Sequence, residues 1–383
     1  MRHLYLAPTG QNRGKTTAAL GLLDGFLRRG LRTGFTKPVG QRTIIEDGVP
    51  ADEDAVLMRD VFGLPEPLEV LSPVHIPRGF TKAYIAGDVV EDLGARIRAA
   101  HRTFADHDVL LVEGTGHAGV GAVIGLSNAV VAAMLGAPAV IVSEGGVGRP
   151  IDEIVLNASL FAAHGVPVAG AIVNKVRLDE QPGIERTLER GLARHGIPLL
   201  GVLPYRPILS NPTLGMILDG LGGRLIALGP DRDRVVGGVT IAAMQPEHLL
   251  DHVGPGTLVI VPGDREDVIA TLTTARLVGQ PRPVTAGELV GGAPPPPVAP
   301  PGLGLVLTGG YEPREAVLAG VRRSGLFATI VEDDTYTVAS AIHDLLVKTH
   351  AGDAGKIALI KELVWDYLEI DRVLRATTEA RLT

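Results

Sequence analysis

The stretch Arg2-His-Leu-Tyr-Leu-Ala-Pro-Thr-Gly-Gln-Asn-Arg-Gly-Lys-Thr-Thr17 joins a short apolar run to the start of an amphipathic segment. Residues 2–7 predict a strand, and residues 15–29 have the apolar spacing of a helix. The loop between them closes on Gly14-Lys15-Thr16. Backbone N–H groups of such a loop point at anionic oxygens, a lysine there adds a point charge, and a threonine hydroxyl can join a Mg²⁺ shell.

The stretch therefore predicts a phosphate-binding loop between a strand and a helix. The residues expected to bind the cofactor are Gln11, Asn12, Arg13, Gly14, Lys15, Thr16 and Thr17. The spacing departs from the usual motif because Thr9 stands where the first glycine is expected, and Gly10 follows one position late. The alternative is a chance Gly-Lys-Thr, which would seldom fall between a strand and a helix that begin at residue 2.

The composition is that of an ordinary globular protein. The chain has 383 residues, 45% hydrophobic and 21% charged, and this length favours two or three domains. A formal net charge of −7 argues against a nucleic-acid partner, and the lack of cysteine excludes disulfides and thiolate catalysis. Because we find no leader pattern and no apolar stretch long enough for a bilayer, we expect a cytoplasmic protein with no membrane partner.

Strand and helix patterns alternate through the first half of the chain. Apolar runs that predict further strands lie at 33–39, 108–114, 137–143, 166–174 and 198–204, with helical patterns between most of them. Such alternation predicts an α/β fold with a mostly parallel sheet covered by helices on both faces. In these sheets, ligands bind beyond the carboxyl ends of the strands.

Chemically active side chains fall at those strand ends. Glu113 ends an apolar strand before Gly114-Thr-Gly116, which is where nucleotide-binding α/β proteins keep a Mg²⁺ ligand. A buried glutamate paired with a lysine or arginine is the structural alternative. Asp54 lies at the start of a helix predicted over about 52–63, so it is either a second metal-shell ligand or a charge that favours the helix dipole.

Lys37 ends the second predicted strand and precedes Pro38, which keeps the backbone extended and projects the side chain from the strand end. Alone, it could equally be a surface lysine. Together with Lys15 it is expected to face phosphate, and these two lysines are the predicted catalytic residues.

The chain changes character after Asn211-Pro212. Strands are predicted at 235–243, 255–262, 304–310 and 327–331, with helices between them and a last helix over 356–373. Residues 279–302 are rich in proline and glycine and predict a mobile insertion in a loop. We therefore divide the chain into a nucleotide-binding domain, 1–212, and a smaller α/β domain, 213–383.

These motifs carry a resemblance to known families. Residues 1–210 resemble the dethiobiotin synthetase branch of P-loop proteins, and the whole chain resembles the dethiobiotin synthetase-like plus DRTGG region at the N-terminus of long phosphotransacetylases. The matching stretches in the first part are Thr9–Thr17, Thr36–Val39, Asp52–Ala55, Val112–Gly116, Gly170–Lys175 and Gly201–Tyr205. Asp264-Arg265 and Thr308-Gly-Gly310 are similar to the two elements of a DRTGG domain.

The resemblance implies ATP and Mg²⁺ as cofactors. It implies that Lys15 and Lys37 contact phosphate or carbamate-type oxygens, and that Thr16, Asp54 and Glu113 hold Mg²⁺. It also implies that Asn174 and the Pro204 region contact adenine. Pro8-Thr-Gly-Gln11 and Gly40-Gln-Arg42 depart from the synthetase pattern, so the diamine-binding parts are not retained.

We expect the protein to be a homo-oligomer. The DRTGG half offers no nucleophile–base pair, so we expect it to serve ligand sensing or dimer formation. Its two strand-end turns could hold a small anion or a nucleotide. The alternative is that the glycines only permit tight strand-to-helix turns.

Three functions remain open at this point. The first is a Mg²⁺-dependent ATP-binding protein with slow ATPase activity and a regulatory DRTGG module. The second is a ligase of the dethiobiotin synthetase type that phosphorylates a small carboxylate or carbamate, with His75, Arg78 and Lys82 as anion-binding candidates. The third is a non-catalytic nucleotide sensor or scaffold for a separate acyltransferase. Because long phosphotransacetylases continue into a separate catalytic domain, we expect no phosphotransacetylase activity from these 383 residues alone.

Overall fold

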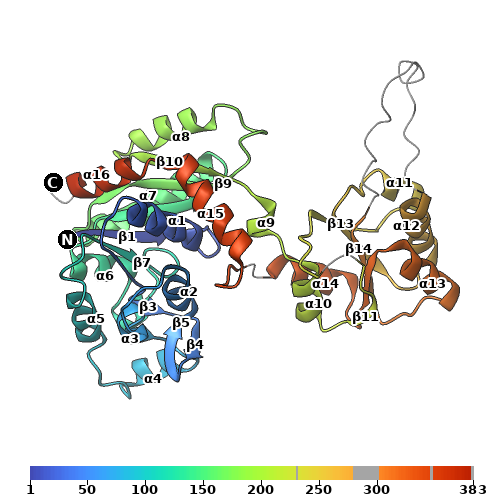
Figure 1. The fold of residues 1–383 in the computed structure, drawn as a ribbon, viewed down its shortest axis with the longest axis horizontal. Helices are drawn as coiled ribbons and strands as arrows, with labels where there is room; N and C mark the ends of the chain where they lie inside the picture. Colours follow the sequence, from blue (N-terminus) through green and yellow to red (C-terminus); the bar gives the residue numbers. More distant parts are fainter. Residues whose placement is uncertain (230–231, 279–301, 346–347, 381–383) are drawn as a thin grey trace. The chain divides into compact units, whose positions relative to one another are not determined.

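The computed structural model describes residues 1–229, 232–278, 302–345 and 348–380. The chain forms two compact units (Figure 1). Unit 1 comprises Met1–Arg206 and Thr349–Thr383, and unit 2 comprises Pro207–Lys348. The second unit is therefore inserted into the sequence of the first.

A six-stranded parallel sheet forms the centre of unit 1. Its strand order is β10-β9-β8-β1-β7-β2, and every pairing in it is parallel. The strands are β1 (Arg2–Pro8), β2 (Thr33–Thr36), β7 (Val109–Glu113), β8 (Ala139–Glu144), β9 (Val168–Val176) and β10 (Leu199–Pro204). All five residues of β7 are buried, as expected of a strand covered on both faces. The predicted α/β fold with a mostly parallel sheet is confirmed.

Helices connect these strands, and α1, α6, α7 and α8 pack against the sheet. They are α1 (Lys15–Arg28), α2 (Glu53–Phe62), α3 (Leu68–Leu71), α4 (Phe80–Ala86), α5 (Leu93–Arg102), the short 3₁₀ turn η1 (Ala122–Ile124), α6 (Asn128–Leu135), α7 (Gly148–Ala163) and α8 (Ile184–Ala193). Both ends of helix α6 are set by local signals. Ser127 caps its start by accepting from the Val130 N–H, and Gly136 ends it in the left-handed conformation.

Two small sheets lie outside the central one. Strand β3 (Val39–Gly40) pairs in parallel with β6 (Val74–His75), and β4 (Thr43–Glu46) forms an antiparallel hairpin with β5 (Val49–Asp52). The sequence did not predict this hairpin. It matters for the site because β5 ends at Asp52 and leads directly into α2, which carries Asp54.

The C-terminal segment does not belong to the second domain, which was predicted over 213–383. The predicted helix 356–373 is two helices, α15 (Ala354–Tyr367) and α16 (Ile370–Ala380), separated by Leu368, which is extended and forms a β-bridge with Gly201. Both pack on α1. A Cβ on Gly21 would overlap Val364, and one on Gly25 would lie 2.8 Å from Ile370. Residues 349–380 therefore belong to unit 1.

Unit 2 is a smaller α/β unit around a five-stranded sheet of order β11-β15-β14-β13-β12. Only β11 is antiparallel to its neighbour. The strands are β11 (Arg224–Ala227), β12 (Gly238–Ile241), β13 (Thr257–Pro262), β14 (Gly304–Thr308) and β15 (Phe327–Ile330). The helices are α9 (Pro207–Ser210), α10 (Leu214–Leu221), α11 (Pro246–Leu250), α12 (Glu266–Val278), α13 (Glu315–Ser324) and α14 (Thr335–Asp344).

Alternate residues of the strands in unit 2 enter two separate apolar cores. Val259 and Leu305 belong to one, whereas Leu258 and Val306 belong to the other, so both faces of the sheet are covered. The proline-rich insertion predicted at 279–302 lies outside the described residues except for Gly302. Within the described part of the chain, no helix combines the length and the apolar character that a membrane crossing requires.

Candidate nucleotide-binding site

The loop after β1 has the predicted strand–loop–helix geometry. Helix α1 begins at Lys15, and Gly14 precedes it with φ 82°. This left-handed conformation favours glycine, and a Cβ at this position would also overlap the side chain of Asn174. The loop follows the carboxyl end of β1, and β1 lies between β7 and β8 in the sheet. The loop is therefore at the edge where parallel α/β sheets bind ligands.

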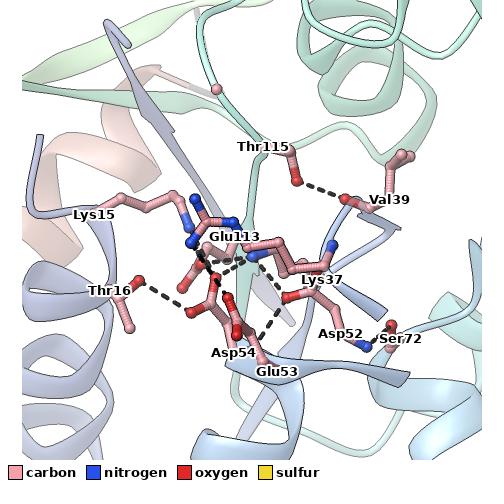
Figure 2. Close-up of polar contacts among 12 residues, drawn as sticks. Lys15, Thr16, Lys37, Val39, Asp52, Glu53, Asp54, Ser72, Glu113 and Thr115 are labelled. Carbon is pink, nitrogen blue, oxygen red and sulfur yellow. Dashed lines mark hydrogen bonds and ion pairs between the residues drawn. The ribbon is translucent and has the colours of Figure 1, made fainter. Parts of the chain in front are cut away.

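Five charged side chains meet beside the start of α1 (Figure 2). Lys15 Nζ lies 3.2 Å from Asp54 Oδ2 and also contacts Glu113 Oε1. Lys37 Nζ lies 2.8 Å from Asp52 Oδ1 and 3.5 Å from Glu113 Oε1, and it contacts Asp54 Oδ2. Three carboxylates thus share two lysines, and we call this group the carboxylate–lysine cluster.

Local structure holds the acidic side chains of this cluster in place. Asp52 caps α2, because its Oδ1 accepts from the Asp54 N–H at 3.1 Å. Its Oδ2 accepts from the Arg42 N–H at 3.2 Å, and its own N–H donates to Ser72 Oγ at 3.0 Å. Asp54 lies two residues further, in the first turn of α2, and its carboxylate contacts Lys15 and Thr16 at the start of α1. Sequence reasoning had used Asp52 only as part of a motif and missed its contact with Lys37.

Burial and charge act in opposite directions on the cluster. Burial raises the pKa of Glu113 to about 7, with Lys15 opposing the change and Asp54 adding to it. Burial would also raise the pKa of Asp54, but the charges of Lys15 and Lys37 hold it well below its usual range. Lys37 loses hydration on burial, yet the carboxylates of Asp54, Glu113 and Asp52 raise its pKa well above the ordinary value. Lys37 is therefore a stable buried cation.

The predicted metal ligands lie close together. Thr16 Oγ1 donates to Asp54 Oδ1 at 3.3 Å, and Glu113 Oε2 is buried without a hydrogen-bond partner in the described structure. Among the described residues, no group of three or more His, Asp or Glu side chains is arranged to hold a metal ion. Mg²⁺ commonly uses one or two carboxylates and takes its other oxygens from phosphate and water, so Thr16, Asp54 and Glu113 fit that kind of site.

The remaining predicted cofactor residues lie around the loop. Gln11 and Asn12 are exposed, and Asn174 is buried with its Nδ2 donating to the Arg13 carbonyl at 3.3 Å. Pro204 is buried at the end of β10. The contact of Asn174 is thus with the loop backbone, and an adenine contact for Asn174 and Pro204 stays a prediction. His75 is half-buried on β6, whereas Arg78 and Lys82 are exposed.

A second polar group on the other side of the loop was not predicted. The guanidinium of Arg13 contacts Glu144 Oε1, and its Nη2 lies 3.1 Å from Glu153 Oε1. Thr9 Oγ1 donates to Glu153 Oε2 at 2.9 Å. The sequence does contain a signal for Glu144, because this residue ends the apolar strand β8 just as Glu113 ends β7.

In unit 2 the Thr-Gly-Gly element forms a tight turn. The N–H groups of Gly309 and Gly310 donate to the carbonyls of Asp333 and Val331, each at 2.9 Å. Both glycines have positive φ, and a Cβ on Gly310 would overlap Glu332. These amides are therefore already used within the fold, which favours the steric interpretation of the glycines over an anion cradle.

A phosphate loop at the carboxyl edge of a parallel sheet, with a lysine and a threonine at the head of the next helix, defines a P-loop α/β protein. Comparison with protein families agrees: the family described as AAA domain matches residues 2–213, and the DRTGG domain matches residues 216–345. The chain belongs to this AAA domain family and carries a DRTGG domain after it.

The curated relatives are longer proteins. The phosphate acetyltransferase of Pseudomonas putida is 28% identical over 388 residues, which covers 96% of this chain and 51% of the relative. The one from Pseudomonas aeruginosa is also 28% identical, over 97% of this chain and 51% of the relative. The chain therefore spans about half the length of the curated relatives it matches.

Among solved structures, the CBS and DRTGG domains of the regulatory region of Clostridium perfringens pyrophosphatase, complexed with diadenosine tetraphosphate, are 22% identical with a TM-score of 0.28. That match covers 38% of this chain and 54% of the other.

Proposed function

We propose that unit 1 binds ATP with Mg²⁺ at the loop and the carboxylate–lysine cluster and hydrolyses it slowly, while unit 2 is a regulatory module. The observation that carries this proposal is the convergence of Lys15 and Thr16, at the head of α1, with the carboxylates of Asp54 and Glu113. These four side chains come from three separate elements, and each has the chemistry that a phosphate–metal site requires.

The loop and Lys15 would neutralise the phosphates. Backbone N–H groups at the start of α1 point at anionic oxygens, and Lys15 Nζ would exchange its carboxylate contacts for oxygens of the β- and γ-phosphates. When bound through Thr16, Asp54 and Glu113, Mg²⁺ would neutralise charge on the same phosphates. Lys37 remains cationic because its carboxylate partners stabilise the charge, so it is available to stabilise the charge of the group that is attacked.

Slow turnover is expected because both lysines are already held by carboxylates. ATP must displace the contacts of Lys15 with Asp54 and Glu113 before the phosphates occupy their place. The curated relatives are phosphate acetyltransferases, so we propose that this region responds to nucleotide and regulates an acyltransferase partner. We further propose that the protein is cytoplasmic and assembles as a homo-oligomer.

The ligase remains the second candidate, and one contact favours it. Thr115 Oγ1 donates to the carbonyl of Val39 at 2.5 Å (Figure 2), so the segment after Lys37 is fastened beside Glu113. A small carboxylate or carbamate bound there would lie near Lys37 and the γ-phosphate.

The test is equilibrium binding and turnover of ATP, with and without Mg²⁺, by the purified protein and by Lys15→Ala. We expect Mg²⁺-dependent binding, slow phosphate release without a second substrate, and loss of both in Lys15→Ala. Stimulation by a small carboxylate or a diamine would favour the ligase. Binding without any turnover would favour a sensor or scaffold, and absence of binding would refute the proposal.

A further inference from the structure

Two unusual backbone conformations meet at the phosphate loop. In the described part of the chain, three non-glycine residues have positive φ: Asn12 at 59°, Asp47 at 52° and Lys175 at 56°. Asn and Asp tolerate this region, but a long side chain such as that of Lys175 disfavours it, so Lys175 depends on surrounding contacts to hold this conformation. Two of the three are bonded to each other, because Lys175 Nζ donates to the carbonyl of Asn12 at 2.6 Å.

The next pair along the two segments is also bonded. Asn174 Nδ2 donates to the carbonyl of Arg13 at 3.3 Å, and the N–H of Gly145 donates to the carbonyl of Asn174 at 2.8 Å. The end of β9 thus holds two consecutive loop carbonyls and is itself held by the end of β8. In a trans peptide the C=O and the following N–H point in opposite directions. Drawing the Asn12 and Arg13 carbonyls toward β9 therefore turns the N–H groups of Arg13 and Gly14 away from it, where they can meet an anion.

Glu144 forms ion pairs with both Arg13 of the loop and Lys175 at the end of β9. Its Oε2 lies 3.3 Å from Lys175 Nζ, and its Oε1 contacts the guanidinium of Arg13. The side chains of Lys175 and Glu144 are 29% and 32% exposed, so the ion pair is partly shielded from solvent. Glu144 therefore lies between the loop arginine and the lysine that holds the loop carbonyl.

We propose that Lys175 and Glu144 form a brace that sets the backbone of the phosphate loop before any nucleotide arrives. Both are positioning residues, since they act through the loop rather than on the phosphates. Only the expected effect of the brace on ATP affinity depends on the proposed nucleotide binding. Its effect on the loop itself is present in the nucleotide-free protein.

The test uses the full chain with four substitutions. Lys175→Met removes the donor and the charge, Lys175→Arg retains a cationic donor, and Glu144→Gln weakens the ion pairs. Arg186→Met, at an exposed position of α8 in the same unit, removes one positive charge away from the loop. Hydrogen exchange of the amides in residues 9–18 is measured without nucleotide, and ATP affinity, KM and kcat are measured separately.

We expect Lys175→Met to speed exchange in residues 9–18 and to weaken ATP binding about tenfold, the effect of one charged hydrogen bond. KM should rise more than kcat falls. Lys175→Arg should recover most of the affinity, Glu144→Gln should change both readouts in the same direction, and Arg186→Met should change neither. Unchanged loop exchange in both Lys175→Met and Glu144→Gln would overturn the brace even if ATP binds well. Failure of the unaltered protein to bind ATP would refute the proposed function, and loop exchange would still decide the brace.

Discussion

Lys37 Nζ lies 2.8 Å from Asp52 Oδ1, and the two side chains are only 6% and 1% exposed. A buried ion pair adds little when compared with an apolar pair of the same shape, but removing one partner leaves the other charge buried and unpaired. Lys37 therefore has a structural role in addition to the catalytic role proposed for it.

Replacing Lys37 should lower both stability and turnover. We expect Lys37→Met to reduce the free energy of unfolding by about 3 kcal/mol, because it leaves Asp52 without its counter-charge. ATP binding should be retained, since Lys15 and the loop are intact. Urea denaturation and a binding titration measure the two effects. The double variant Lys37→Met/Asp52→Asn is the control and should recover part of the stability, and a Lys37→Met variant with unchanged unfolding and turnover would contradict both roles.

Glu113 should make stability depend on pH in a defined direction. Its pKa is raised from 4.5 to about 7, so the folded state binds this proton more tightly than the unfolded state does. The contribution of Glu113 to stability is complete below about pH 4.5 and is lost as the pH rises through about 7. Glu113→Gln carries no such charge. Relative to the unaltered protein, it should therefore gain on the order of 2 kcal/mol between pH 5 and pH 8.

The same Glu113→Gln variant should lower Mg²⁺-dependent turnover, because a neutral amide oxygen is a weaker Mg²⁺ ligand than a carboxylate. Urea denaturation at several pH values and a turnover assay provide the two measurements. A stability difference that does not vary between pH 5 and pH 8 would show that Glu113 does not titrate as described.

Asp54 should determine how much Mg²⁺ the protein requires. Its carboxylate contacts Thr16, Lys15 and Lys37, so it is the member of the cluster that joins the two lysines to the threonine. We expect Asp54→Asn to raise the Mg²⁺ concentration for half-maximal turnover by about tenfold, the loss of one charged ligand. Asp60→Asn, at an exposed position of the same helix, is the matched control. Equal Mg²⁺ curves for the two variants would exclude a metal role for Asp54.

The contact between α1 and α15 should be sensitive to a single methyl group. Because a Cβ on Gly21 would overlap Val364, we expect Gly21→Ala to lower the free energy of unfolding by about 2 kcal/mol. Adding Val364→Ala should restore part of this loss by making room. Gly148→Ala is the control, since a Cβ there meets no atom within 4 Å. If the double variant is no more stable than Gly21→Ala, the two helices do not pack as described.

Much of the site was predictable because its signals are local. Strand-end position identified Lys15, Lys37 and Glu113, and the structure brings all three together because the carboxyl ends of β1, β2 and β7 meet at one edge of the sheet. The same rule extends to Glu144 at the end of β8, but its partner Arg13 was predicted only to bind the cofactor. Which charges pair across that edge depends on side-chain directions that no single segment encodes.

The amino-acid sequence by itself determined the elements of this protein: the strand, phosphate loop and helix of residues 2–28, the alternation that makes a parallel sheet, and the capped helix Asn128–Leu135. These depend on apolar spacing, glycine conformation and capping residues within one segment. Only the tertiary structure decided that residues 349–380 return to α1 and that Lys175 holds the Asn12 carbonyl. Both are contacts between segments more than 160 residues apart, and they exist only after the sheet has brought those surfaces together.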